Sequence, residues 1–400
     1  MVKFACCLFS LMSVLISTAC SNQNNAGNNI DTNTANNPSM DTNANTTRFA
    51  ATRGCKNVGI LLPESDSSVR YEAYDRPLLE KEIKQAIPGV TIQYANANNN
   101  ADTQQNQAEA ALTNGACILV VGPQNGDKAS VIVQRAKASQ VPVIAYDRLI
   151  QDPDTAFYVS FDNVRVGELQ GQYIVDQFRK GAFGLKPGAK LVMINGAQTD
   201  HNALQFREGA LKALQPLIDS KNINLIFDQY TPNWDSARAQ SSIEEILAQQ
   251  QSNVQIVYAA NDGLANTVIA ALRTQNLDGR VLVTGQDAAV AGIQNILTGD
   301  QAMTIYKPIA KEAQVTAQLV AALSNGTDPG ALVNRQTALQ TGGQVASVLL
   351  EPLAVDRSNV QQTVIADRYL TREQICSGLN GDTTGICRNV VRAKQQMGSR

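Results

Sequence analysis

The stretch VIAYDRLIQDPDTAFYVSFDNVRVGELQG, residues 143–171, decides the fold. It opens with an apolar run at 143–146 that is typical of a buried strand, and this run ends at an acid beside a base, Asp147 and Arg148. A second short strand is predicted at 157–161, with a helix at 164–179. In open α/β sheets, ligands bind beyond the carboxyl ends of the strands. The stretch therefore predicts a polar binding site at a sheet edge, and a place where the chain leaves one sheet for another.

Short apolar runs alternate with amphipathic helical patterns on both sides of this stretch. Strands are predicted before it at 58–62, 90–94 and 118–121, and after it at 191–194, 223–228, 256–259, 281–284 and 303–306. Alternation of this kind predicts an α/β fold with parallel sheets covered by helices on both faces. The length of 400 residues is enough for two such units. We therefore predict two doubly wound lobes.

Composition narrows the function classes. The chain has 33 basic and 35 acidic residues, so no strong basic field favours nucleic acid as a partner. A single histidine makes a His-rich metal site or a His-based catalytic triad hard to assemble. We expect neither a metal nor another cofactor.

Residues 1–19 have the pattern of an export signal, with Lys3 followed by an apolar core from Phe4 to Ile16. The small residues before Cys20 resemble a bacterial lipoprotein box, which would make Cys20 the lipidated first residue of the mature chain. They also suit plain signal cleavage. Residues 20–55 are rich in Asn and have no core-forming pattern, which is typical of a tether. We therefore expect an exported protein, anchored through Cys20 or else released.

In an oxidising compartment the remaining cysteines have natural partners. Cys55 and Cys117 each precede a predicted strand, and these two strands would be neighbours in a 2-1-3 order, within disulfide distance. Cys376 and Cys387 flank a loop near the C-terminus. The alternative is unpaired buried thiols.

Polar and aromatic side chains follow most of the predicted strands. Hydroxyl groups of a sugar donate and accept hydrogen bonds, so acids, amides and guanidinium groups satisfy them in pairs, while aromatic rings pack on its C–H faces. Each residue also has a purely structural interpretation, such as an ion pair, a core ring or a helix N-cap. The pattern favours a sugar over a phosphate, because no Gly-rich phosphate loop is present. The residues concerned are Arg70, Tyr71, Asp147, Arg148, His201, Asn202, Trp234, Asn261, Asp262, Asp287 and Lys307.

Five motifs carry a resemblance to a known family: residues 143–170, DHNALQFREG at 200–209, AANDGLA at 259–265, TGQDAAVAGI at 284–293 and MTIYKPI at 303–309. From about residue 57 to 369 the chain resembles the periplasmic xylose-binding protein family, type I sugar-binding proteins of ABC importers. The resemblance implies ligand-binding roles for Arg70, Tyr71, Asp147, Arg148, Asn202, Trp234, Asn261, Asp287 and Lys307. Two departures, Tyr71 and His201, leave the sugar open between xylose and another aldose such as glucose.

The resemblance also implies a domain plan with three crossings between the lobes, near Asn163, Pro308 and Gln340. The N-terminal lobe would comprise residues 56–163 and 309–340, the C-terminal lobe 164–308 and 341–372, and a C-terminal extension 373–400. We expect a monomeric, non-enzymatic protein of the periplasm or outer face of the cytoplasmic membrane, which delivers a monosaccharide to an ABC permease. A sensor that presents the sugar to a chemoreceptor or histidine kinase is the alternative.

Overall fold

The computed structural model describes residues 50–65, 68–379, 382 and 384–387, all within one compact unit. The predicted export signal, Cys20 and residues 20–49 of the predicted tether lie outside the described residues. Among the described residues, no helix has the length and apolar character needed to cross a bilayer.

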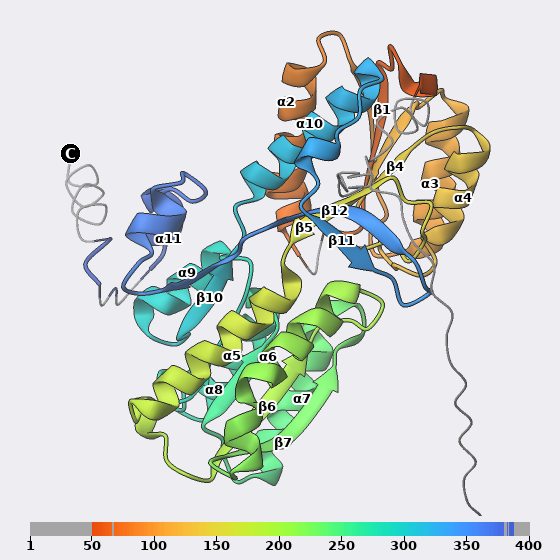
Figure 1. The fold of residues 1–400 in the computed structure, drawn as a ribbon. Helices are drawn as coiled ribbons and strands as arrows, with labels where there is room; N and C mark the ends of the chain where they lie inside the picture. The colour runs from red at the N-terminus through yellow and green to blue at the C-terminus, as the bar shows by residue number, and fades with distance from the viewer. Residues whose placement is uncertain (1–49, 66–67, 380–381, 383, 388–400) are drawn as a thin grey trace, which may run out of the picture. The chain divides into compact units, whose positions relative to one another are not determined.

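A seven-stranded sheet forms the N-terminal lobe, in the order β11-β12-β5-β4-β3-β1-β2. All of its neighbouring strands pair in parallel except β11 and β12, which are antiparallel. Helices α2 and α10 cover one face and α3 and α4 the other (Figure 1). The strands are β1 (Asn57–Leu62), β2 (Thr91–Asn96), β3 (Ile118–Val121), β4 (Val143–Tyr146), β5 (Phe157–Phe161), β11 (Arg335–Ala338) and β12 (Gln344–Leu350). The helices are η1 (Ala50–Thr52), η2 (Tyr71–Asp75), α2 (Arg76–Ala86), α3 (Ala101–Thr113), α4 (Ser130–Ala138), α10 (Ile309–Asn325) and η5 (Gly330–Leu332).

The C-terminal lobe has a parallel four-stranded sheet, β7-β6-β8-β9, and an antiparallel pair, β10 and β13. Backbone hydrogen bonds from Ala302 N to Val283 O (2.9 Å) and from Ile305 N to Gly285 O (3.1 Å) join the two. The strands are β6 (Ala189–Asn195), β7 (Ile223–Tyr230), β8 (Ile256–Ala259), β9 (Leu282–Val283), β10 (Met303–Tyr306) and β13 (Leu353–Asp356). The helices are α5 (Asn163–Arg179), η3 (Ala182–Gly184), α6 (His201–Asp219), η4 (Pro232–Trp234), α7 (Ser236–Gln249), α8 (Asp262–Thr274), α9 (Val290–Thr298), η6 (Gln361–Ile365) and α11 (Arg372–Cys376). The predicted α/β class with two parallel-sheet lobes is confirmed.

The inner strands of both sheets (β1, β3, β4, β5, β6 and β8) are almost entirely buried on both faces, which explains why they appear in the sequence as continuous apolar runs. Helix α10 follows β10 of the C-terminal lobe, yet its apolar face, including Ala313, Val320 and Leu323, packs in the core of the N-terminal lobe. The chain therefore crosses from the C-terminal lobe to the N-terminal lobe between β10 and α10.

Helices α5 and α6 lie side by side at very close range (Figure 1). A Cβ atom on Gly167 would lie 1.9 Å from Phe206 O, and one on Gly209 would lie 2.0 Å from Val164 O. Only glycine fits where two helix backbones approach this closely. This contact holds the N-terminus of α6, and with it Asp200 and Asn202, beside the point where the chain enters α5.

One predicted boundary is wrong. Strand β12 pairs with β5 in the N-terminal lobe, and β13 pairs with β10 in the C-terminal lobe, so the third crossing lies after Leu350 and not near Gln340. The other two crossings lie at residues 162–163 and 307–308. Gly342 and Gly343, both with φ near +90°, turn β11 into β12 as a hairpin, which keeps both strands in one sheet.

Both predicted disulfides are present, Cys55–Cys117 and Cys376–Cys387. The end of the predicted tether is part of the fold, which moves that boundary toward the N-terminus. Thr52 Oγ1 donates to Leu323 O (2.7 Å), Gly54 N donates to Ser324 O (2.7 Å), and Thr52 and Cys55 are buried. The described part of the C-terminal extension also packs on the protein, because Cys376 and Cys387 lie in an apolar cluster with residues of α9.

Candidate functional site

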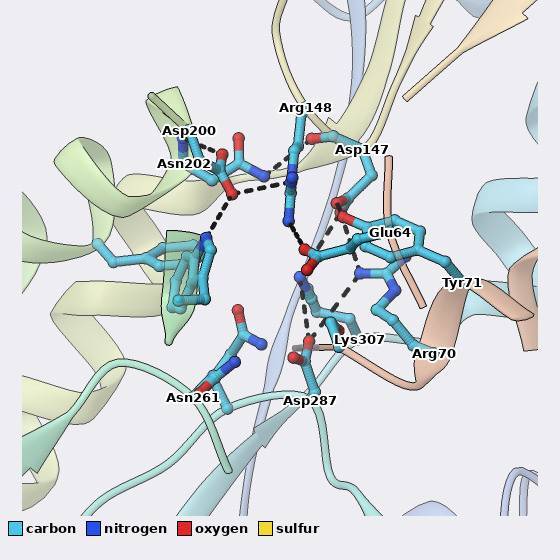
Figure 2. A pocket seen from close by; sticks show the side chains of 14 residues that line it. Glu64, Arg70, Tyr71, Asp147, Arg148, Asp200, Asn202, Asn261, Asp287 and Lys307 are labelled. Atoms are coloured by element: carbon cyan, nitrogen blue, oxygen red, sulfur yellow. Dashed lines mark hydrogen bonds and ion pairs between the residues drawn. The ribbon is translucent and has the colours of Figure 1, made fainter. Parts of the chain in front are cut away.

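The nine side chains with predicted ligand roles line one small cavity. Those of the N-terminal lobe follow β1 and β4, and those of the C-terminal lobe follow β6, β7, β8 and β9, with Lys307 after β10. Figure 2 shows them converging from opposite sides. The carboxyl ends of both sets of strands therefore face the same space, as expected for α/β sheets. His201 is not among the lining residues.

Arg70 forms the base of the site on the N-terminal lobe. Its guanidinium donates to Asp147 Oδ1 (3.0 Å), to both oxygens of Asp75 (2.7 and 2.9 Å) and to Glu312 Oε2 (2.9 Å). Tyr71 donates its hydroxyl to the other oxygen of Asp147 (2.6 Å). Both carboxylate oxygens of Asp147 are thus held by fixed donors, which sets the direction of this side chain in the cavity.

Arg148 lies across the gap between the lobes. One of its Nη atoms donates to Glu64, and its Nε lies 2.9 Å from Asp200 Oδ2. Its guanidinium carbon lies 5.3 Å from the centre of the Tyr71 ring, within range of a cation–π contact. Asp147 and Arg148 are adjacent in the sequence, but they do not form an ion pair with each other. Asp147 bonds Arg70 and Tyr71, whereas Arg148 contacts Glu64 and Asp200.

Lys307 connects the two lobes at their second crossing. Its Nζ lies 3.6 Å from Asp147 Oδ1 and 3.4 Å from Asp287 Oδ1. Asp147 belongs to the N-terminal lobe and Asp287 to the C-terminal lobe, so one ammonium group neutralises a carboxylate from each (Figure 2). Lys307 is buried, so it is not a solvent-exposed turn residue.

The indole of Trp234 forms an aromatic wall on the side of the C-terminal lobe. A Cβ atom on Gly196 would lie 2.1 Å from its ring, so the absence of a side chain there makes room for the indole. Its Nε1 donates to Asp200 Oδ2 (3.2 Å). One end of the ring is fixed by this bond, while the residue lines the cavity.

Two asparagine side chains in the site, Asn261 and Asn202, already make hydrogen bonds within the protein. Asn261 Oδ1 accepts from Leu264 N (2.9 Å) as the N-cap of α8, which confirms its capping interpretation and leaves its amide nitrogen for the cavity. Asn202 Oδ1 accepts from Asn163 (2.9 Å), and its Nδ2 donates to Asp147 O (3.0 Å). Asp287 is not a cap, because α9 begins after Ala289.

Three of the lining residues have a left-handed backbone: Asp147 (φ 58°), Trp234 (φ 55°) and Asp287 (φ 94°). Residues other than glycine rarely adopt this conformation, and such residues concentrate at functional sites. At Asp147 it is held by hydrogen bonds from Asp147 N to Val159 O (2.8 Å) and from Ser160 Oγ to Asp147 O (2.7 Å). The turn aims the carboxylate back over the end of the sheet.

Carboxyl groups outnumber cations in this buried cluster. The cations are Arg70, Arg148 and Lys307, and the carboxyl groups are those of Glu64, Asp75, Asp147, Asp200, Asp287 and Glu312. Burial raises the pKa of Asp147, but the charges of Arg70 and Lys307 outweigh it, so its net pKa lies below the ordinary value. Burial keeps the pKa of Glu64 and Asp200 above the ordinary value in spite of Arg148, and that of Glu312 well above it in spite of Arg70. Because carboxyl groups outnumber cations here, the site disfavours a negatively charged ligand.

Three buried atoms of the lining make no hydrogen bond of ordinary geometry among the described residues: Glu64 Oε2, and also Arg148 Nε and Asp287 Oδ1, which have only ion-pair contacts with Asp200 (2.9 Å) and Lys307 (3.4 Å). Two of them accept and one donates, and such atoms are rare in protein interiors. In the described part of the chain, no cluster of three or more histidine, cysteine or acidic side chains could hold a metal ion. The site is therefore suited to a neutral molecule that both donates and accepts.

Sequence reasoning missed five lining residues: Glu64, Ser68, Asp200, Phe206 and Gln286. Three of them lie inside the quoted motifs, Asp200 and Phe206 in DHNALQFREG and Gln286 in TGQDAAVAGI, so proximity to the predicted residues was an available signal. Glu64 lies in the loop after β1, where nothing in the sequence shows that it meets Arg148, 84 positions later.

The chain matches the family model described as "Periplasmic binding protein domain" over residues 58–328. It is 37% identical to the D-xylose-binding periplasmic protein of Escherichia coli (strain K12) over 78% of this chain and 91% of that protein. It is 36% identical to the protein of the same name from Haemophilus influenzae, over 82% of this chain and 95% of that protein.

A solved solute-binding protein of an ABC transporter from Clostridium phytofermentans, with bound β-D-glucose, is similar in structure. The TM-score is 0.73 at 30% identity, and the match covers 80% of this chain and 100% of that one. These proteins bind solutes and do not transform them, so the prediction that the chain is not an enzyme is confirmed by its relatives. The chain belongs to the periplasmic binding protein family, in the group of the xylose-binding periplasmic proteins.

Proposed function

We propose that this protein captures a neutral aldose, D-xylose or else D-glucose, between its lobes and delivers it to an ABC importer. The observation that carries the proposal is the convergence of Asp147, Arg148, Trp234, Asp287 and Lys307 on one small cavity between the lobes. Charged donors and acceptors there match the hydroxyl groups of a sugar ring, and the indole matches its C–H face. Relatives named for D-xylose and a neighbour with bound D-glucose support these two sugars as ligands.

The site residues have distinct roles in this proposal. Asp147 and Asp287 accept hydrogen bonds from sugar hydroxyl groups, and Arg148, Lys307 and Asn261 donate to sugar oxygens. Trp234 and Tyr71 contribute the aromatic surfaces. Asn202 positions the carbonyl end of β4, since its amide already bonds Asp147 O and Asn163. Closure of the lobes about the three crossings excludes water and strengthens each buried hydrogen bond.

Calorimetric titration with xylose, glucose, galactose, arabinose and ribose tests the proposal. We expect saturable binding with the highest affinity for xylose or glucose. D-glucuronate is the matched control for D-glucose, because it adds one carboxylate to the same ring, and we expect it not to bind. Absence of binding for every aldose, or preference for the acid, would refute the proposal.

Trp234 gives an independent signal. It is the single tryptophan of the chain and lines the cavity, so its fluorescence reports on this site alone. We expect the emission to change with the same midpoint as the calorimetric titration. Binding heat without any change in emission would place the sugar elsewhere.

Delivery and anchoring are part of the proposal. Cys20 would carry the lipid, residues 21–49 would span the distance to the folded part, and the monomer would meet the permease at the membrane surface. Cys20→Ser should move the protein from the membrane to the soluble fraction without changing sugar affinity. Loss of sugar uptake on deletion of this protein would support delivery to an importer.

A sensor role is the second candidate, and the name of one relative favours it. The multiple sugar-binding periplasmic receptor ChvE of Rhizobium radiobacter is 32% identical over 82% of this chain and 94% of that protein. Under this alternative the deletion leaves uptake unchanged and abolishes a transcriptional or chemotactic response to the sugar.

A further inference from the structure

A second, larger cavity of about 350 Å³ adjoins the proposed sugar site. The two share four lining residues, Ser68, Arg70, Asn261 and Asp287. The two cavities therefore adjoin at these four side chains.

The lining of the second cavity differs from that of the first. Its new members are mostly apolar or aromatic, including Tyr74, Val290 and Tyr369. Tyr74 and Tyr369 form a tilted ring pair with centres 4.8 Å apart, and both rings are partly exposed. Tyr369 also donates its hydroxyl to Asp287 O (3.2 Å), which fixes this ring beside the first cavity. Aromatic faces of this kind pack on the C–H faces of sugar rings.

Polar groups at the rim complete the match to a sugar. Ser236 and Asn266 line the cavity beside Asn261, and Asn266 uses its Oδ1 to accept from Asn295 (2.6 Å), which leaves its amide nitrogen for a ligand. Val69 is 59% exposed at the same cavity, and few large apolar side chains of the described chain are exposed at all.

We infer that the second cavity is a subsite for a second sugar ring, so that the protein binds disaccharides as well as monosaccharides. This inference rests on the proposed function, since one ring of the disaccharide occupies the first cavity. The second ring stacks on Tyr74 and Tyr369 and bonds the amide of Asn266, and the glycosidic oxygen lies beside Asn261 and Asp287.

The probes are xylobiose, cellobiose and maltose, compared with xylose and glucose by calorimetry, with phenyl β-D-glucoside as an apolar alternative to the second ring. We expect at least one disaccharide to bind within tenfold of its monosaccharide. Binding of a monosaccharide but of no disaccharide overturns the inference and leaves the proposed function intact. Binding of the phenyl glucoside alone, without any disaccharide, also overturns it, because the occupant is then not a sugar.

A variant that fills the second cavity separates the two sites. Ala291 lines the second cavity and not the first, and it is exposed on α9. Ala291→Tyr should weaken disaccharide binding at least tenfold and change monosaccharide affinity less than twofold. Ala270→Tyr, the same change at an exposed position of α8 outside both linings, is the matched control and should affect neither. Equal disaccharide affinity in the Ala291→Tyr variant and the control would overturn the inference.

Discussion

The indole nitrogen of Trp234 donates to Asp200 Oδ2 at 3.2 Å, and the same carboxylate oxygen lies 2.9 Å from Arg148 Nε. Asp200 thus holds an aromatic wall and a charged donor of the cavity at once. It also accepts from Asn202 N as the cap of α6, so it is tied to the backbone of the C-terminal lobe. Asp200, for which the sequence predicted no role, therefore orients Trp234 and Arg148, two predicted ligand-binding residues.

Asp200→Ala should therefore weaken sugar binding, mainly because Asp200 holds Trp234 and Arg148 in place. The loss of its bond to Trp234 and its ion pair with Arg148 should raise Kd roughly tenfold to a hundredfold, the effect of one charge-assisted bond. Titration calorimetry measures it. Asp219→Ala, at the exposed end of the same helix, is the control and should leave Kd unchanged. Equal affinities in the two variants would contradict the positioning role.

Arg148→Ala removes a charge-assisted donor from a buried site, and we expect it to cost about 2–4 kcal/mol of sugar binding. Arg148→Lys keeps the charge but not the planar fork, so it should restore only part of the affinity. Arg179, on α5 with a side chain 70% exposed, gives the control Arg179→Ala. Urea unfolding of each variant checks that the fold persists. Unchanged affinity in Arg148→Ala would rule out its assigned role.

Glu312→Gln should change the pH dependence of stability. Burial raises the pKa of Glu312 well above its usual value, so the folded protein retains a proton that the unfolded chain loses above about pH 4.5. In the wild type, the proton retained by Glu312 makes the free energy of unfolding fall as pH rises, by up to about 1.4 kcal/mol per pH unit. Glutamine does not titrate, so the variant should gain stability relative to the wild type between pH 5 and 7. Urea unfolding of both proteins at pH 5, 6 and 7 measures this. If the difference in free energy of unfolding between variant and wild type were the same at all three pH values, the raised pKa would be contradicted.

The two disulfides should contribute unequally to stability. Cys55–Cys117 joins residues 62 apart and Cys376–Cys387 residues 11 apart, and the entropy removed from the unfolded chain grows with loop length. Replacing both cysteines of the first pair with serine should cost about 4 kcal/mol, and the same change in the second pair about 3 kcal/mol. Urea unfolding of the two double variants measures this. A larger loss from the second pair would show that local packing outweighs chain entropy.

Several parts of this fold could be predicted from the sequence because they depend on local pattern. Buried parallel strands appear as apolar runs, and the polar residue after each run lies at the edge where ligands bind. Asp147, Asn261, Asp287 and Lys307 were found in this way, and all four line the cavity. The same pattern also collected the other predicted residues, and the family resemblance then implied ligand-binding roles for nine of them.

Long-range pairing accounts for what sequence reasoning did not find. Nothing near Glu64 indicates that it meets Arg148, and the left-handed backbone of Asp147 and Asp287 follows from hydrogen bonds to strands distant in the sequence. The misplaced crossing near Gln340 has a local explanation. Gly342 and Gly343 between two strand-like runs are a hairpin signal, which indicates that both runs belong to one sheet.

The attachment of the N-terminal segment has a mechanical consequence. Cys55 lies just before β1 and is bonded to Cys117, which directly precedes β3, and these strands are neighbours in the seven-stranded sheet. A pull on the N-terminus is therefore shared between two adjacent strands by a covalent link. Because both strands are loaded at the same end, the force does not slide one past the other, and tension from the segment before Cys55 leaves their pairing intact.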